Sequence, residues 1–309
     1  MSDESTLNAN LYTNERTLGE KLGWWFRKSI YNFRANPLLY IGATIFALLI
    51  LVAIFAPWLA PYEPLKMNFA HKLQSPNSEH WFGTDNLGRD IFSQVLYGAR
   101  TSLSVGVITV VLSLLIGLPI GLVAGYAGGR IDSVLMRMSD VFLAFPPMLL
   151  PICMIAILGP GLMNVMLAIA LSWFPWYSRI LRAAVISVRN EQYVLSAQAA
   201  GVGHFTIMFK HLLPNAMTPL LIQVSMDFGY VILWAAALSF LGLGAVPPTL
   251  EWGLMIGNAQ SLFLEYWWTA VFPGSAIFLT VLAANLLGDG LRDALDLNLR
   301  GESRYVTFS

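Results

Sequence analysis

Charged side chains are scarce in this sequence. Asp, Glu, Lys and Arg make up 12% of its 309 residues, whereas soluble domains carry roughly 25%. Hydrophobic residues make up 56%, and the mean hydropathy is +0.62. The formal net charge is zero, so no surplus of positive charge indicates a nucleic-acid partner. The composition therefore predicts a membrane protein.

Several motifs of catalysis and metal binding are missing as well. One cysteine, Cys153, excludes an internal disulfide and a CxxC metal site. No Gly-Lys pair occurs, so the sequence has no Walker A loop for ATP hydrolysis. HExxH and GxSxG are absent, and no histidine lies in a long apolar segment. We therefore expect no catalytic residue, no metal site and no cofactor in this chain.

Long apolar segments are abundant, and a spanning helix needs about 20 such residues. Six segments qualify: Leu38–Ala60, Ser102–Tyr126, Val134–Leu158, Leu162–Ser178, Ala216–Leu243 and Trp267–Leu287. The first follows a polar tail and has no A-x-A site after it, so we expect an uncleaved helix rather than a signal peptide. The sequence thus predicts an all-α, polytopic membrane protein with six transmembrane helices.

Prolines distinguish the third and fourth segments. The third contains Pro146-Pro147 and Pro151, which remove backbone donors and should kink or break the helix. Broken spans are tolerated where protein or water satisfies the freed carbonyls, so this segment should lie inside the bundle or line a path. The fourth segment is short, and the sequence does not determine where near Pro175 it ends.

The distribution of Lys and Arg predicts the topology. With the N-terminus inside, 14 of the 18 basic residues fall in inner segments. The outer segments hold only Lys66, Lys72, Arg89 and Arg100. An even number of spans then places both the N- and the C-terminus in the cytoplasm.

The same topology divides the chain. Residues 1–36 form a cytoplasmic tail, in which Tyr12–Asn36 suits an amphipathic helix lying on membrane lipids. Residues 37–60 form the first span, 61–101 a periplasmic loop and 291–309 a cytoplasmic tail. The core, residues 102–290, includes a cytoplasmic loop at residues 185–215.

A dense motif occupies the periplasmic loop at residues 80–90. Gly83 and Gly88 allow tight turns with positive φ, and Asp90 suits the N-cap of the following helix. Trp81 and Phe82 suit a membrane interface. A metal site formed by one histidine and two carboxylates, His80, Asp85 and Asp90, is the less favoured alternative.

The cytoplasmic loop reads as two short helices around a break at Gly201-Val202-Gly203. The second helix should begin at His204. Phe205, Met208, Phe209 and Leu212 follow the spacing i, i+3, i+4, i+7 and form one apolar stripe. The stripe could bind a soluble partner or pack on the bundle of its own chain.

The outer motif, the six spans and the cytoplasmic loop together resemble one family over about residues 37–300. It is the second permease subunit of dipeptide, oligopeptide and nickel ATP-binding-cassette importers. The family's loop carries Glu-Ala-Ala, three residues, Gly and, later, Leu-Pro; Gly201 and Leu213-Pro214 match. Leu195-Ser196-Ala197 occupies the Glu-Ala-Ala position without its acidic residue, and His211 occupies a usually apolar one. Glu191 lies one turn earlier.

The resemblance implies a type I importer permease (MetI-like) fold in a bacterial inner membrane. It implies half of a pathway for di- and oligopeptides, a second homologous permease, two ATP-binding subunits that bind ATP and Mg, and a periplasmic or lipid-anchored solute-binding protein. The residues that would couple this chain to the ATPases are Leu195, Ser196, Ala197, Gly201, Gly203, His204, Phe205, Met208, Phe209, Leu213 and Pro214. Import of nickel or another small solute is an alternative, and an ion-coupled secondary transporter is a further one.

Polar residues inside spans are functional candidates by default. Asp227, Gln223 and Asn285 are therefore candidates for lining the pathway, although Asp227 could instead make a structural contact with a neighbouring helix. Asp140 and Arg137, near the inner end of the third span, are expected to form an ion pair.

Overall fold

The computed structural model describes the backbone of residues 37–305 and the side chains of residues 37–293. The main helices are α3 (Pro37–Leu59), α4 (Ile91–Ala127), α5 (Gly129–Leu143), α6 (Leu149–Leu158), α7 (Leu162–Arg189), α10 (Leu213–Phe240) and α12 (Trp268–Tyr305). Shorter elements are η1 (Phe69–His71), α8 (Gln192–Ala199), α9 (His204–Thr206), η2 (Ile207–Leu212) and α11 (Trp252–Asn258). Residues 37–305 contain no strand, which confirms the all-α prediction. The amphipathic helix expected within residues 12–36 lies outside the described part.

Within the described part of the chain, four helices are long and apolar enough to cross a membrane. They are α3, α4, the continuous helix His204–Phe240 and the Trp268–Asp293 part of α12. They match the first, second, fifth and sixth predicted spans. The third predicted span corresponds to α5 followed by α6, and the fourth corresponds to α7.

The second span begins earlier than expected, at Ile91 instead of Ser102. The reason is a strong cap, because the carboxylate of Asp90 accepts the N–H of Ser93 at 2.7 Å. The added turns are buried against α11 and α12, where the indole of Trp252 contributes to the same apolar cluster as Ile91. Tertiary packing therefore extends the helix beyond the apolar run that is visible in the sequence.

Prolines act differently at three places. Residues 144–148 separate α5 from α6, so the break predicted at Pro146-Pro147 is confirmed. Pro151 lies in the first turn of α6, where a missing N–H costs nothing. Pro175 does not end the fourth span, because α7 continues through it to Arg189. Pro175 is buried, and its neighbours hold the helix together.

A ridge of glycines joins α4 to α7. Gly117, Gly121 and Gly125 recur every four residues and thus share one helix face. A Cβ on Gly117 would lie 2.8 Å from the carbonyl oxygen of Phe174, and one on Gly121 would lie 2.5 Å from that of Ser178. Small residues at this spacing let two membrane helices approach closely.

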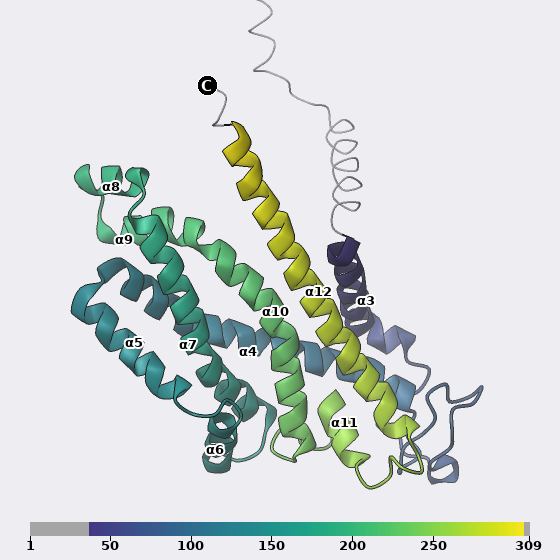
Figure 1. Cartoon of the computed structure of the whole chain (residues 1–309). Coiled ribbons are helices and arrows are strands. Elements are labelled where there is room, and N and C mark those ends of the chain that lie inside the picture. Colours follow the sequence, from purple (N-terminus) through teal and green to yellow (C-terminus); the bar gives the residue numbers. More distant parts are fainter. Residues whose placement is uncertain (1–36, 306–309) are drawn as a thin grey trace, which may run out of the picture.

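The helices form a bundle with two distinct sides (Figure 1). α3 and α12 pack together on one side, α5, α6 and α7 lie on the other, and α10 contacts both α7 and α12. α8 and α9 lie at one end of the bundle, here called the α8 end, and α11 lies at the opposite end.

Candidate functional site

Residues 191–215 form two short helices joined by a tight turn at the α8 end. α8 closes in a Schellman motif, in which Val202 N–H donates to the carbonyl of Ala197 and Gly201 N–H to that of Gln198. Gly201 has a φ of +76°, a left-handed conformation that penalises any Cβ. The structure therefore has the predicted helix break.

Gly203 contributes in another way. Its φ of −61° and ψ of 145° are extended values that other residues adopt freely. A Cβ on either Gly201 or Gly203 would meet no atom within 4 Å. Backbone conformation, rather than space, is thus what requires glycine, and it does so only at Gly201.

A widened turn follows at η2. The N–H of Leu213 donates to the carbonyl of Met208, five residues earlier, as in a π-helix. Pro214 comes next, and in a regular α-helix its ring would clash with the carbonyl of Lys210. The π-turn relieves that clash, so Leu213-Pro214 carries the loop directly into α10.

The predicted apolar stripe points in two directions. Phe205 is 71% exposed and Phe209 is 45% exposed, with ring centroids 4.4 Å apart. Leu212 is fully buried, and Met208 packs against the same buried cluster. Met208 therefore lies on the bundle side rather than on the outward face expected for it. The π-turn explains the change, because its side chains do not follow the 3.6-residue period.

The residues at the Glu-Ala-Ala position lie mostly at the surface. Leu195 and Ser196 are exposed, and Ala197 is half-buried beneath the Schellman turn. The carbonyl of Glu191 accepts the N–H of Leu195 and starts α8. The Glu191 side chain is exposed, so its backbone is the part that shapes the loop.

The loop is firmly attached to the membrane helices. Val194 of α8 and Ile207 of η2 are buried in one cluster with Leu181 and Val185 of α7. A hydrogen bond of 2.5 Å joins the Tyr126 hydroxyl of α4 to the loop's predicted coupling residue His204, at Nδ1. A force on the loop would therefore be transmitted to α4 and α7.

Arg189 ties the ends of α4 and α7 together. Its Nη1 donates to the carbonyls of Gly125 and Tyr126, at 3.2 and 2.9 Å. These carbonyls belong to the last turn of α4, which lacks partners within its own helix. A cavity of about 610 Å³ opens beside this contact and is also lined by Leu195 and His204. Sequence reasoning missed Arg189 and Tyr126, because their link joins residues far apart in the chain.

The pathway candidate Asp227 is enclosed between helices. It is 4% exposed, and its Oδ1 accepts the Nε2–H of Gln223, one turn earlier, at 2.9 Å. Its Oδ2 makes no hydrogen bond among the described residues, and neither do the buried Trp173 Nε1 and Tyr177 hydroxyl of α7. This enclosure favours the structural contact over a lining position for Asp227. Asn285 is half-buried, and its Oδ1 has no hydrogen-bond partner among the described residues.

Two ion pairs join α5 to α7. Arg179 Nη2 lies 2.5 Å from Asp140 Oδ1, and Arg182 Nε lies 2.5 Å from Asp132 Oδ1. The partner of Asp140 is thus Arg179, and the expected pairing with Arg137 is wrong. The prediction chose Arg137 because it is near Asp140 in sequence, but α7 packs beside α5 and brings Arg179 next to Asp140. The hydrogen bond from Arg182 lowers the pKa of Asp132, at the start of α5.

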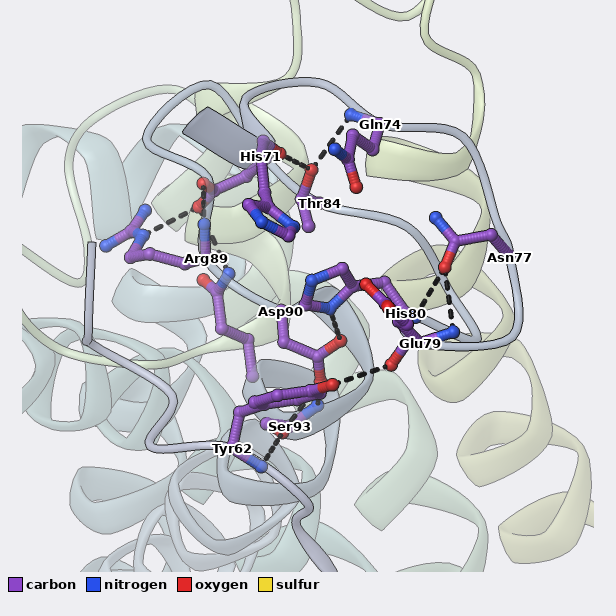
Figure 2. Close-up of polar contacts among 12 residues, drawn as sticks. Tyr62, His71, Gln74, Asn77, Glu79, His80, Thr84, Arg89, Asp90 and Ser93 are labelled. Carbon is purple, nitrogen blue, oxygen red and sulfur yellow. Dashed lines mark hydrogen bonds and ion pairs between the residues drawn. The ribbon is translucent and has the colours of Figure 1, made fainter. Parts of the chain in front are cut away.

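The outer motif, residues 80–90, forms a network of polar contacts at the end of the bundle opposite to α8 (Figure 2). His80 Nδ1 and Asp90 Oδ1 lie 2.9 Å apart, and Asp90 Oδ2 caps α4 through Ser93. Arg89 Nε donates to Asp85 Oδ2 at 2.7 Å. His80 and Asp90, two of the three candidate metal ligands, thus contact each other, and the third, Asp85, is paired with Arg89. Among the described residues no group of three His, Cys, Asp or Glu is placed to hold a metal ion.

The glycine turns of the motif match the prediction. Gly83 and Gly88 have φ of 73° and 72°, and a Cβ on either would collide with backbone. Trp81 is exposed, as an interface residue should be, whereas Phe82 stacks on Phe272 of α12 at 3.9 Å. The motif thus also anchors the loop to the bundle.

A buried carboxylate that sequence reasoning missed lies nearby. Glu251 accepts the N–H groups of Gly253 and Leu254 at 2.9 and 2.8 Å and thereby caps α11. Burial raises the pKa of this carboxyl. The only local signal was an acidic residue before Trp252-Gly253.

Comparison with known proteins agrees with this architecture. Residues 117–301 match the family described as "Binding-protein-dependent transport system inner membrane component", and residues 24–76 match the "N-terminal TM domain of oligopeptide transport permease C". The first match covers more than half of the chain, which therefore belongs to that family. It is a multi-pass inner-membrane protein and a permease subunit of an ATP-binding-cassette importer.

Relatives of known function align over most of the chain. The chain is 45% identical to the dipeptide transport system permease protein DppC of Alkalihalophilus pseudofirmus, over 89% of this chain and 90% of the relative. It is 40% identical to the probable D,D-dipeptide transport system permease protein DdpC of Escherichia coli K12, over 98% and 99%. It is 44% identical to the nickel transport system permease protein NikC of the same strain, over 86% and 96%.

Solved structures share the fold. A structure of the MetNI methionine ABC transporter in an inward-facing conformation aligns with a TM-score of 0.54 at 18% identity, over 65% of this chain and 96% of that chain. An amino acid ABC transporter aligns with a TM-score of 0.51 at 18% identity, over 64% and 92%. The predicted type I permease (MetI-like) fold is thereby confirmed.

Proposed function

We propose that this chain is one of two permeases of a peptide importer and that it is driven through the loop 191–215. The named cargo of two of the three relatives above is a dipeptide. Nickel, the cargo named for the third, is the alternative. A secondary transporter that acts alone is disfavoured by the family membership.

The observation that carries the coupling proposal is the exposed pair Phe205 and Phe209 on a rigidly attached loop. Large aromatic rings that are exposed side by side on a protein surface commonly mark a site that binds a partner. A groove on an ATP-binding subunit would cover them, as in other helix-in-groove contacts. That subunit would bind ATP and Mg, for which this chain has no Walker A loop.

The attachment of the loop 191–215 to α4 and α7 would carry movement from the ATP-binding subunits into the membrane helices. When two ATP-binding subunits close on ATP, they would pull on the docked rings. The Tyr126–His204 and Arg189 contacts would pass the displacement to α4 and α7 as rigid elements. The pathway would then switch between outside and inside access, and a solute-binding protein would deliver cargo at the α11 end. In this orientation the α8 end and both chain termini would lie in the cytoplasm, as the bias of Lys and Arg predicts.

The direct test is native mass spectrometry of the gently solubilised complex purified through this chain. The proposal predicts a particle with a second six-span permease and two ATP-binding subunits, and peptide binding by the accompanying solute-binding protein. Recovery of this chain alone in a transport-competent form would refute the importer assembly. A solute-binding protein that binds nickel and no peptide would support the alternative cargo.

A variant pair tests the docking surface within the same experiment. Phe205→Asp with Phe209→Asp should abolish recovery of the ATP-binding subunits and leave the second permease attached. Phe69→Asp is the control, because Phe69 is 68% exposed in the periplasmic loop. Equal recovery of the ATP-binding subunits from the loop variant and from the control would rule out docking through this pair.

A further inference from the structure

The break between α5 and α6 lies midway along the third predicted span, Val134–Leu158, and is exposed. α5 has 15 residues and α6 has 10, so at 1.5 Å per residue the break lies near the middle of their crossing. Residues 144–147 are all exposed in this chain. Pro146 and Pro147 carry no N–H, and non-helical backbone is tolerated in a membrane only against protein or water. This face is therefore not covered by lipid.

An exposed ion pair on the same face leads to the same conclusion. The Asp140 and Arg179 side chains are 52% and 43% exposed. Asp140 lies six residues into the predicted span that begins at Val134, which is roughly 9 Å from the start of that span. Charges at such depth face a bundle interior or a water-filled cavity. The side of the bundle formed by α5, α6 and α7, away from α3 and α12 (Figure 1), is thus the side that faces the pathway.

A cavity of about 330 Å³ opens on this face. Its walls are largely aromatic, and Trp173 and Trp234 form one of them with ring centroids 4.7 Å apart. Phe145 from the helix break and Trp176 from α7 also line it, and both are about half exposed. Arg179 supplies its positive charge. An apolar cavity of this size with one fixed charge is typical of a small-molecule site.

We propose that this pocket binds the cargo during passage and selects solutes that combine a carboxylate with an aromatic or large apolar side chain. The inference rests on the proposed peptide cargo and specifies it. Arg179 uses Nη2 for Asp140, and a guanidinium has five N–H donors, so it retains donors for the cargo's carboxylate. Trp176 and Phe145 contact the apolar side chain. A helix of the second permease is the competing occupant.

The test uses the complete importer with its solute-binding protein in proteoliposomes. Initial uptake of Ala-Phe, Ala-Phe amide and Ala-Ala is compared for wild type, Trp176→Ala, Arg179→Gln and the distant control Trp58→Ala. Trp176→Ala should lower uptake of Ala-Phe about tenfold or more relative to Ala-Ala. Arg179→Gln should abolish the wild-type preference for Ala-Phe over its amide. Trp58→Ala should change neither ratio.

Ratios between cargos separate a contact from a structural defect, since misassembly lowers uptake of every peptide alike. Unchanged ratios in both pocket variants would overturn the pocket assignment while leaving peptide import intact. A photoreactive residue at Trp176 that captures the second permease instead of cargo would overturn it as well. Failure of the wild type to import any of the three peptides would instead refute the proposed peptide cargo, and the inferred selectivity with it.

Discussion

The backbone at Gly201 gives the sharpest prediction for the loop. An L-residue in the left-handed conformation costs roughly 1–2 kcal/mol, and Gly201 has φ of +76° with open space around it. Gly201→Ala should therefore favour opening of the α8 turn by about 5- to 30-fold. Asn tolerates this conformation better than Ala does, so Gly201→Asn should recover most of the loss. Gly203→Ala should cost little, because Gly203 is extended.

The assay combines hydrogen exchange with function. Amide protection across residues 192–202 is measured in the assembled importer, together with peptide uptake and peptide-stimulated ATP hydrolysis. The expected order for protection and coupled uptake is wild type, Gly203→Ala, Gly201→Asn and Gly201→Ala, with the largest drop at the last. An equal loss from Gly203→Ala and Gly201→Ala would refute the argument from backbone conformation.

Three further predictions concern the bundle. Gly121→Ala should lower the thermal stability of the detergent-solubilised protein, because its Cβ would lie 2.5 Å from a carbonyl oxygen; Gly274→Ala, whose Cβ would meet nothing closer than 3.9 Å, should not, and equal melting of the two would contradict the packing. Asp227→Ala should reduce assembly, costing about 1–3 kcal/mol because the Gln223 amide loses its acceptor, and Asp227→Asn should restore it; an Asn variant that assembles fully but transports nothing would instead indicate a pathway role. Because the pKa of Asp132 is lowered in the folded protein, its stabilisation is present above the ordinary value of 3.8 and is lost as pH falls through the folded value. The melting difference between wild type and Asp132→Asn should thus be constant from about pH 7 to about pH 5 and shrink only in stronger acid; a difference that vanished by pH 5 would contradict the assignment.

Local signals in the sequence were sufficient for many features. The run Leu38–Leu59 carries no charge, so α3 could be placed almost to the residue. Asp90 was identifiable as a cap, and Pro146-Pro147 as a break, because both effects act within one or two turns. The turn at Gly201 followed from glycine spacing alone.

Features that depend on tertiary contacts could not be predicted in this way. The first turns of α4 are stabilised by packing on Trp252, which lies far along the chain. Arg179 pairs with Asp140 because α5 and α7 lie side by side, although Arg137 is nearer in sequence. The outward placement of Phe205 without Met208 arises from a π-turn, which hydrophobic periodicity does not reveal.

Coupling through the loop requires Phe205 to contact an ATP-binding subunit, and photo-crosslinking detects that contact. A photoreactive phenylalanine analogue is placed at position 205 or, as a control, at position 69 of the assembled importer. We expect a covalent product with the ATP-binding subunit from position 205 and none from position 69. Products from position 205 that contain only this chain or lipid would contradict docking through Phe205.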